Sequence, residues 1–275
     1  MQTTTRRTVT ASIALAMLAS VAGFPVAPAT AQQEADDPWP GIRKDLYAAR
    51  DISEGDGAIE LTAPVRAEDA AVVPITMRIP ASVAATAKTL TLVIDKNPMP
   101  VAATFTFGPA AGSGERMIDT RVRVDMYSNV RAVLETTDGK LHMATKYVKA
   151  AGGCSAPALK DQEQALAELG KMKLRLHEAN QTPMMQEAQV MIRHPNYSGM
   201  QMNQLTGLYI PAKFIDSMEV KRGSDTVFTM TGGISLSENP NIRFTYAGGS
   251  DNDLSVVAKD TTGATFNIRQ SAKGS

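Results

Sequence analysis

Residues 130–154 read VRAVLETTDGKLHMATKYVKAAGGC, and this stretch indicates an all-β fold. On either side of Asp138-Gly139, apolar and polar side chains alternate, which is the pattern of a strand with one buried face. Asp-Gly between two alternating runs is a strong signal for a β-hairpin, because its backbone accepts positive φ angles. The stretch therefore predicts paired strands over Val130 to Thr136 and Leu141 to Val148, followed by a segment of small residues.

The same two-residue period recurs upstream of this hairpin. Further strands are expected at 59–61, 72–79, 90–94, 103–107 and 117–124. Seven short strands with turn signals at regular spacing predict a β-sandwich. A short helix is expected within 35–52, with Pro38 and Pro40 in its first positions. The glycine-rich segment 108–114 lacks a following Lys-Ser/Thr and a helix, so it is interpreted as a hairpin connection.

A second series of alternating segments follows a short helix expected over Leu159 to Leu169. Its strands are expected near 171–177, 189–195, 210–215, 217–221, 227–230, 242–246, 254–258 and 264–268. This series predicts a second sandwich of ordinary domain size. The expected organisation is a first domain over 32–150, a linker with the helix over 151–170, and a second domain over 171–275.

The first residues have the features of an export signal. Arg6-Arg7 precedes an apolar run from Val9 to Val26, and Ala29-Thr30-Ala31 offers a cleavage site. These features predict a signal peptide over 1–31, read by the general or the twin-arginine route, and a periplasmic mature protein. Removal leaves 275 − 31 = 244 residues with a formal charge of 26 − 28 = −2. Near-neutral charge argues against nucleic-acid binding, and no later segment is apolar enough to span a membrane.

Cys154 is the single cysteine of the chain. An exported protein normally pairs its cysteines, so a lone one predicts a free, usable thiol or an intermolecular bridge. Gly152 and Gly153 give the backbone freedom, and Pro157 ends any regular element there. We therefore expect an exposed thiol on a flexible arm. The alternative is a structural cysteine buried as a small apolar side chain.

Several segments together resemble a known pair of proteins. Lys149 to Cys154 resembles the Gly-Gly-Cys arm of SoxY, and segments 192–195, 210–215 and 237–244 resemble SoxZ. The chain thus resembles a SoxY–SoxZ fusion, the sulfur carrier of periplasmic thiosulfate oxidation. This resemblance implies two immunoglobulin-like domains and a sulfur intermediate held covalently on Cys154 for partner enzymes. The chain differs in continuing past the cysteine through Ser155-Ala156-Pro157, which tethers the arm at both ends.

Two further functions compete with the carrier. Fused versions are associated with quinoprotein (PQQ) alcohol dehydrogenase systems, so the chain is alternatively a binding or assembly module in which Cys154 is inessential or forms a homodimer disulfide. Copper delivery would use His194 or His177 with methionines such as Met202, because soft ligands suit Cu(I). No metal-ligand spacing or catalytic triad stands out, so we expect neither a resident cofactor nor an enzyme. The expected partners are periplasmic redox enzymes of a Sox-like or quinoprotein system.

Overall fold

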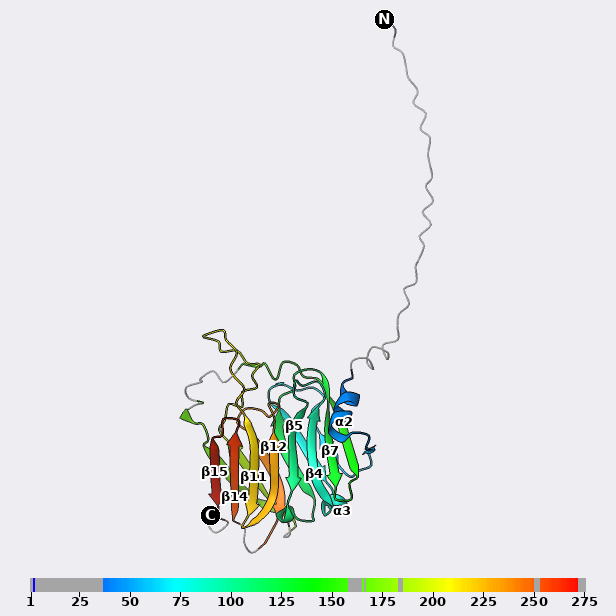
Figure 1. Ribbon diagram of the computed structural model, residues 1–275, viewed down its shortest axis with the longest axis vertical. Helices are drawn as coiled ribbons and strands as arrows, with labels where there is room; N and C mark the ends of the chain where they lie inside the picture. The colour runs from blue at the N-terminus through cyan, green and yellow to red at the C-terminus, as the bar shows by residue number, and fades with distance from the viewer. Residues whose placement is uncertain are drawn as a thin grey trace. The chain divides into compact units, whose positions relative to one another are not determined.

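The computed structural model describes Gln2 and residues 37–157, 165, 167–182, 185–249 and 253–271. The predicted signal peptide and most of the predicted helix over 159–169 lie outside these residues. From Pro38 to Ser275 the chain forms one compact unit. Figure 1 shows this unit as two β-sheets packed face to face, with the short helix α2 (Trp39–Tyr47) at one edge.

The strands divide at the cysteine segment into two halves. The first half holds β1 (Ile52–Glu54), β2 (Glu60–Thr62), β3 (Val73–Ile79), β4 (Ala87–Ile94), β5 (Val101–Phe107), β6 (Arg116–Val122), β7 (Ser128–Thr136) and β8 (Leu141–Val148). The second half holds β9 (Met172–Thr182), β10 (Met185–Ile192), β11 (Ile215–Arg222), β12 (Asp225–Gly232), β13 (Asn241–Ala247), β14 (Leu254–Asp260) and β15 (Thr265–Gln270). The short helices α3 (Ala81–Ala84) and η1 (Pro109–Ala111) lie in connections of the first half.

Both sheets run through both halves. The nine-stranded sheet has the order β1-β8-β7-β4-β5-β12-β11-β14-β15, and the six-stranded sheet has the order β2-β3-β6-β13-β10-β9. The halves join where β5 pairs antiparallel with β12 and β6 with β13. Main-chain hydrogen bonds therefore cross the junction in each sheet, which makes the two halves one continuous sandwich.

A single apolar core fills the space between the sheets. Phe105 of the first half lies edge-on to Phe228 of the second, with ring centroids 5.6 Å apart. Phe228 in turn contacts Phe244 of the opposite sheet at 5.1 Å. Such edge-to-face pairs add about 0.5–1.5 kcal/mol each beyond the burial of their area. The core thus contains side chains from both halves and from both sheets.

The all-β prediction is confirmed, and so are the seven strands expected in the first half. The hairpin at Asp138-Gly139 joins β7 to β8, and Gly139 has the positive φ of 83° that the turn requires. Alternation predicted these strands well because each has one face in the core, as the burial of every second residue in β3 shows. The helix expected within 35–52 is also present as α2.

Three features differ from the sequence prediction. The parallel pairing of β1 with β8 was not expected. Segment 108–114 is no hairpin, because it carries the chain from β5 in one sheet to β6 in the other. Segment 210–215 is loop up to Phe214, held by isolated bridges from Lys213 to Tyr197 and from Tyr209 to Met202. Pro211 cannot donate a main-chain hydrogen bond to a neighbouring strand, which disfavours a continuous strand there.

Candidate functional site

The cysteine arm leaves the sheet at the end of β8 and is fastened at its root. The amide of Lys149 donates to the carbonyl of Val65, and the carbonyl of Lys149 accepts from the amide of Ala67. Ala150 is buried. The freely extending part of the arm can therefore begin only at Ala151, one residue before the glycine pair.

Gly152 and Gly153 turn the arm back against the loop that follows β6. Gly152 has a φ of 78°, and its amide donates to the carbonyl of Asp125. Gly153 packs so closely that an added Cβ would lie 2.1 Å from the carbonyl oxygen of Ala70 and 2.7 Å from the backbone of Val124. The first glycine thus supplies a left-handed turn, and the second permits a backbone contact that no side chain allows.

Cys154 is fully buried, with 0% of its surface exposed. Its amide donates to Asp125 Oδ1 at 3.1 Å, and its carbonyl accepts from Ser198 Oγ at 2.5 Å. The expectation of an exposed thiol on a free arm is therefore wrong for this conformation. Gly152 is exposed as expected, but Gly153 and Cys154 are docked, because three segments distant in sequence converge on them.

Docking suppresses the reactivity of the thiol. Burial, with a smaller contribution from the charge of Asp125, raises the pKa of Cys154 to about 12, against the opposing effect of Arg123. Because the thiolate is the nucleophile, a docked Cys154 stays protonated and unreactive at neutral pH. The docked position can therefore shelter the sulfur atom of Cys154. A reaction at that atom requires the arm to leave this docked position, which we call its seat.

Arg123 is the charged group beside the arm. Its side chain is 1% exposed, and Nη1 donates to the carbonyl oxygen of Gly153 at 3.2 Å. Within the described residues, its Nε and Nη2 have no hydrogen-bond partner. Burial lowers the pKa of Arg123, while the charges of Glu238, Cys154 and Asp69 raise it. A buried cation with two unused donors thus lies against the residue that precedes the cysteine.

The opposite wall comes from the SoxZ-like side of the junction. We call residues 193–214, between β10 and β11, the cover loop. Ser198 of this loop binds the Cys154 carbonyl, and its amide donates to Gln201 Oε1 at 3.1 Å. Gln201 is fully buried, and among the described residues its Nε2 has no partner. The cysteine site is therefore built from both halves.

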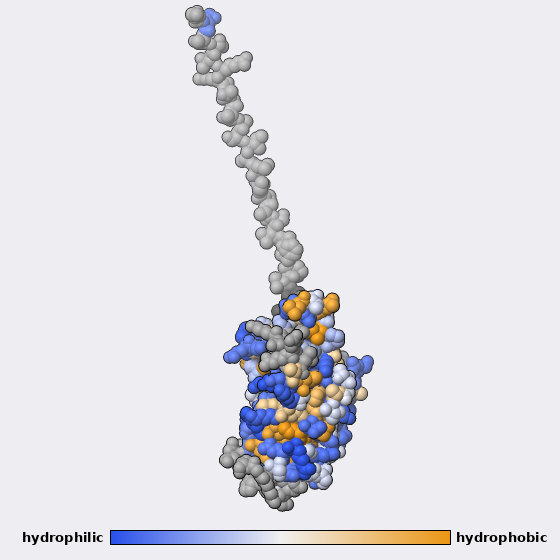
Figure 2. All heavy atoms as spheres, turned by 90° about the vertical axis from the view of Figure 1, so that its left-hand side faces the viewer, coloured by the Kyte–Doolittle hydropathy of each residue, from blue (hydrophilic) through white to orange (hydrophobic). Residues whose placement is uncertain are grey.

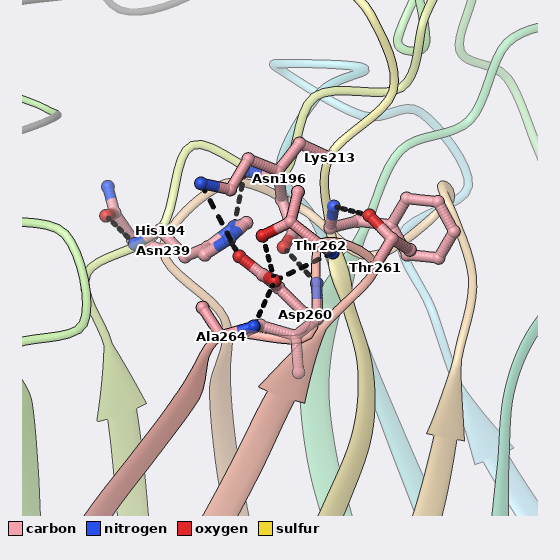
Figure 3. Close-up of polar contacts among 10 residues, drawn as sticks. His194, Asn196, Lys213, Asn239, Asp260, Thr261, Thr262 and Ala264 are labelled. Atoms are coloured by element: carbon pink, nitrogen blue, oxygen red, sulfur yellow. Dashed lines mark hydrogen bonds and ion pairs between the residues drawn. The ribbon is translucent and has the colours of Figure 1, made fainter.

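A buried polar cluster fastens the ends of the cover loop, as Figure 3 shows. Nδ1 of His194 accepts from the amide of Asn196 at 3.0 Å, and Nε2 faces Asp260 Oδ2 at 3.4 Å. Lys213 Nζ lies 3.5 Å from the same oxygen. Residues from the start and the end of the loop thus meet at the turn after β14, and Asn196 Oδ1 also accepts from the Ile215 amide.

Burial sets the charge of His194 in this cluster, and hydrogen bonds set that of Asp260. Burial lowers the pKa of His194 although Asp260 opposes it, so the ring is neutral at pH 7. Burial pulls the pKa of Asp260 upward, but hydrogen bonds from Thr262 and Ala264 outweigh it and lower the pKa to about 2. A neutral imidazole and an ionised carboxylate with satisfied partners form a structural clasp for the loop.

Copper binding through His194 finds no support in this geometry. Both ring nitrogens of His194 are engaged and the ring is buried, whereas Met202 is 43% exposed. In the part of the chain that the structure describes, no group of three His, Cys, Asp or Glu side chains is arranged to hold a metal ion. Nor is any helix there long and apolar enough to cross a membrane.

Apolar side chains are exposed around the same end of the molecule. On the cover loop, Leu205, Leu208 and Tyr209 are 96%, 68% and 68% exposed. Met126 and Tyr127, directly after Asp125, are also exposed. In Figure 2, hydrophobic residues are visible at the upper end of the body as well as in a band farther down it. Exposed apolar groups beside a site commonly mark a surface that contacts another protein.

Sequence reasoning located Cys154 but missed its partners. Arg123 stands between valines in the alternating run Arg121-Val122-Arg123-Val124, where nothing distinguishes it from the exposed Arg121. Asp125 and Ser198 lie in loops, far from the cysteine in sequence. The one available signal was Gly153, because a glycine next to a unique cysteine fits a close backbone contact as well as it fits flexibility.

In a comparison with known proteins, each half of the chain matches a protein-family model. Residues 43–154 match the family model of the sulfur oxidation protein SoxY, and residues 174–271 match that of the sulphur oxidation protein SoxZ. The sulfur carrier protein SoxY from Chlorobium limicola f thiosulfatophilum is 25% identical, with a TM-score of 0.34, and covers 41% of this chain and 94% of its own. A β-glycosidase from Bacteroides vulgatus is 8% identical, with a TM-score of 0.23, over 78% of this chain and 24% of its own. No curated protein matches the chain.

The fold and the site define a two-part immunoglobulin-like sandwich with one cysteine docked where the parts meet. The chain is a SoxYZ-like fusion, because its first half matches the SoxY family and its second half matches the SoxZ family of sulfur oxidation proteins. These two matches support a carrier role in sulfur oxidation. The SoxY match ends at Cys154, the residue that closes the docked arm.

Proposed function

We propose that this protein is a periplasmic carrier that holds a sulfur-containing intermediate covalently on Cys154 and presents it to partner redox enzymes. The observation that carries the proposal is the docked arm. The single thiol of the chain lies on a short glycine-containing segment at the junction of the two halves, and side chains of both halves bind it. A carrier needs such a seat because its cargo must be sheltered between partners.

The seat is suited to reversible release. A few hydrogen bonds hold the segment from Gly152 to Cys154, and their partners are Val124, Asp125, Arg123 and Ser198. Each contributes about 0.5–1.5 kcal/mol, and somewhat more where a charge takes part. Undocking therefore costs far less than separating the halves, whose junction includes paired strands and aromatic core. Local opening of this size lies at the low-stability end of a fold.

The chemistry takes place with the arm released. Once exposed, the thiol regains an ordinary pKa, so a few per cent is thiolate near neutral pH. Joining that thiolate to thiosulfate forms one S–S bond and gives up two electrons, which a partner redox enzyme accepts. Attack of another thiolate on the outer sulfur of the disulfide bond transfers the cargo to that thiol and returns the Cys154 thiolate. Hydrolysis at a partner instead releases the terminal sulfonate as sulfate and leaves a persulfide on Cys154, and attack of a further thiolate on the outer sulfur of that persulfide returns the thiol. The carrier supplies the sulfur atom and its shelter, and the partners supply the redox power.

Replacing the sulfur atom tests this function. In the native host, Cys154→Ser should abolish sulfur-compound oxidation while the purified variant keeps the circular dichroism spectrum and melting temperature of the wild type. Ser155→Ala is the matched control, because Ser155 is exposed and adjacent to the cysteine. Full activity of Cys154→Ser would overturn the proposal.

The alternative, an assembly module for a quinoprotein alcohol dehydrogenase, draws on the exposed apolar residues of the cover loop. In that case Leu205→Ser with Leu208→Ser should impair alcohol oxidation in the host, and Cys154→Ser should have no effect on it. Growth on thiosulfate and on alcohol, measured with both variants, separates the two functions.

A further inference from the structure

Two buried side chains near Cys154 carry donors that nothing in the described part of the protein accepts. They are Nε and Nη2 of Arg123 and Nε2 of Gln201, on side chains that are 1% and 0% exposed. Unused buried donors are rare in folded proteins, because each forfeits its hydrogen bonds to water. A buried guanidinium without a directly bound carboxylate is rarer still.

Both side chains are linked to the cysteine by hydrogen bonds. Arg123 binds the carbonyl of Gly153, and its charge acts on the Cys154 thiol. Gln201 binds the amide of Ser198, whose hydroxyl binds the Cys154 carbonyl. The two groups approach the cysteine from opposite halves of the molecule. Since Ser198 and Gln201 lie in a loop and not in a paired strand, that wall can adjust to an added group.

We propose that Arg123, assisted by Gln201, is the receptor for an oxyanion at the end of the cargo on Cys154, and that it holds the sulfonate-bearing arm in the docked position. This inference rests on the proposed carrier function and names the chemical class that the docked seat retains. A terminal sulfonate offers several oxygen acceptors and a negative charge, which a guanidinium binds in a forked, charge-assisted geometry. A sulfane or methylthio group offers neither, so the seat distinguishes oxidised from reduced cargo.

The surrounding acids set the strength of this receptor. Glu238 and Asp69 act on Arg123 electrostatically, and Asp125 acts on Cys154. Glu238 is half-buried, and its own pKa is raised by burial and lowered by Arg123. Its carboxylate competes with the cargo for the same cation. Removing that charge should therefore strengthen retention of a sulfonate, the opposite effect from removing Arg123.

Two adducts of the mature protein allow the receptor to be tested without partner enzymes. In mild urea, the Cys154 thiolate attacks an inner sulfur of tetrathionate, and thiosulfate leaves, which yields the S-thiosulfonate with no added oxidant. Methyl methanethiosulfonate similarly yields the neutral methylthio adduct, with methanesulfinate leaving. Urea is then removed, and intact mass confirms each adduct. A phosphine cleaves the adduct by reducing its S–S bond with two electrons. The phosphine becomes the phosphine oxide, and its oxygen comes from water.

The measured quantity is the cleavage rate of each adduct in the variant divided by that in the wild type. Arg123→Met should speed loss of the sulfonate adduct at least about tenfold, as expected for loss of a charge-assisted contact, and change loss of the methylthio adduct less than about twofold. Glu238→Gln should slow loss of the sulfonate adduct alone. Gln201→Leu provides the same test with a smaller effect, should Arg123→Met fold poorly.

The proposal that Arg123 is an oxyanion receptor would be overturned if Arg123→Met changed the cleavage rates of the two adducts by the same factor. The same criterion applies to Gln201→Leu if that variant must be used. That result would leave the carrier function standing, provided Cys154→Ser still abolishes oxidation in the host. Conversely, Arg123→Met could speed loss of the sulfonate adduct alone while Cys154→Ser remained fully active in sulfur-compound oxidation. That result would support an anion-binding site beside Cys154 and reject the carrier function. The two failures are therefore distinguishable.

Discussion

Two buried arginines in the same half of the molecule have very different surroundings. Arg131 on β7 places Nε 2.9 and 3.0 Å from the two carboxylate oxygens of Asp95, places Nη2 2.9 Å from one of them, and stacks 4.3 Å from the ring of Trp39. Among the residues that the structure describes, Arg123, directly after β6, makes one side-chain hydrogen bond, to a carbonyl, and its Nε and Nη2 have no partner. The first cation is satisfied by the fold itself. The unused donors of Arg123 would be satisfied only when a ligand with acceptor oxygens binds to them.

This contrast separates a structural charge from a functional one. A buried ion pair with good geometry is costly to break, whereas a buried cation without a bound carboxylate contributes little to stability and is retained for another reason. Arg116 is an intermediate case, since its Nε has no partner within the described part of the chain but its guanidinium lies over the ring of Phe107, 4.6 Å from the centroid. Arg123 combines two unused donors with a neighbouring nucleophile.

The largest expected effect comes from exchanging each arginine for methionine. Arg131→Met removes the guanidinium that binds the buried carboxylate of Asp95 and should cost about 3–5 kcal/mol of unfolding free energy. Arg123→Met should lie within about 1 kcal/mol of the wild type, because removal of an uncompensated charge offsets the lost hydrogen bond. Urea denaturation of the two variants measures both values. Equal losses would show that Arg123 is as structural as Arg131.

The next effect concerns the seat of the arm. Gly153→Ala would place a Cβ 2.1 Å from the Ala70 carbonyl oxygen, so the arm should undock and alkylation of Cys154 should accelerate at least about tenfold. Gly139→Ala is the control, since that glycine also sits in a turn but has open space around it. The control should lose about 1 kcal/mol of stability through its positive φ and leave the thiol unreactive. An unchanged alkylation rate in Gly153→Ala would contradict the docked arm.

A pH titration sharpens the same comparison through the thiol. Docking raises the pKa of Cys154 to about 12, above its ordinary value. Below about pH 8.5 both the folded and the unfolded chain keep the proton, so the stabilisation is fully present. Above that pH the unfolded chain releases the proton and the folded chain does not, so stability falls as pH rises toward 12. Urea denaturation at pH 7.5 and 9.5 should show about 1 kcal/mol more loss in the wild type than in Cys154→Ser, and identical losses would refute a buried thiol.

The smallest effect is expected from the cover loop. Ser198→Ala removes the hydroxyl that donates to the Cys154 carbonyl, at a cost of about 1 kcal/mol in docking. Alkylation of the thiol should accelerate roughly fivefold, with little change in global stability. Ser155→Ala, on the exposed side of the arm, should leave the rate unchanged. Equal alkylation rates in Ser198→Ala and Ser155→Ala would show that the SoxZ-like half does not help to hold the cysteine arm.

The strands could be predicted from the sequence because the signal for a strand is local. Alternation in residues 72–79 and the turn at Asp138-Gly139 each depend on a few neighbouring residues. The joining of β5 to β12 could not be predicted in this way, since partner choice depends on residues more than one hundred positions apart. The burial of Cys154 was missed for the same physical reason. Its seat needs Ala70, Val124 and Ser198 together, and no local pattern brings them there.

The most direct test of the account is the intact mass of the protein purified from its native host without reductant. If Cys154 carries the cargo, the mature chain should have an adduct on Cys154 that ends in a sulfonate group, and a reductant should remove the added mass. A population carrying only the bare thiol, in cells that are actively oxidising sulfur compounds, would contradict the claim that Cys154 carries the cargo.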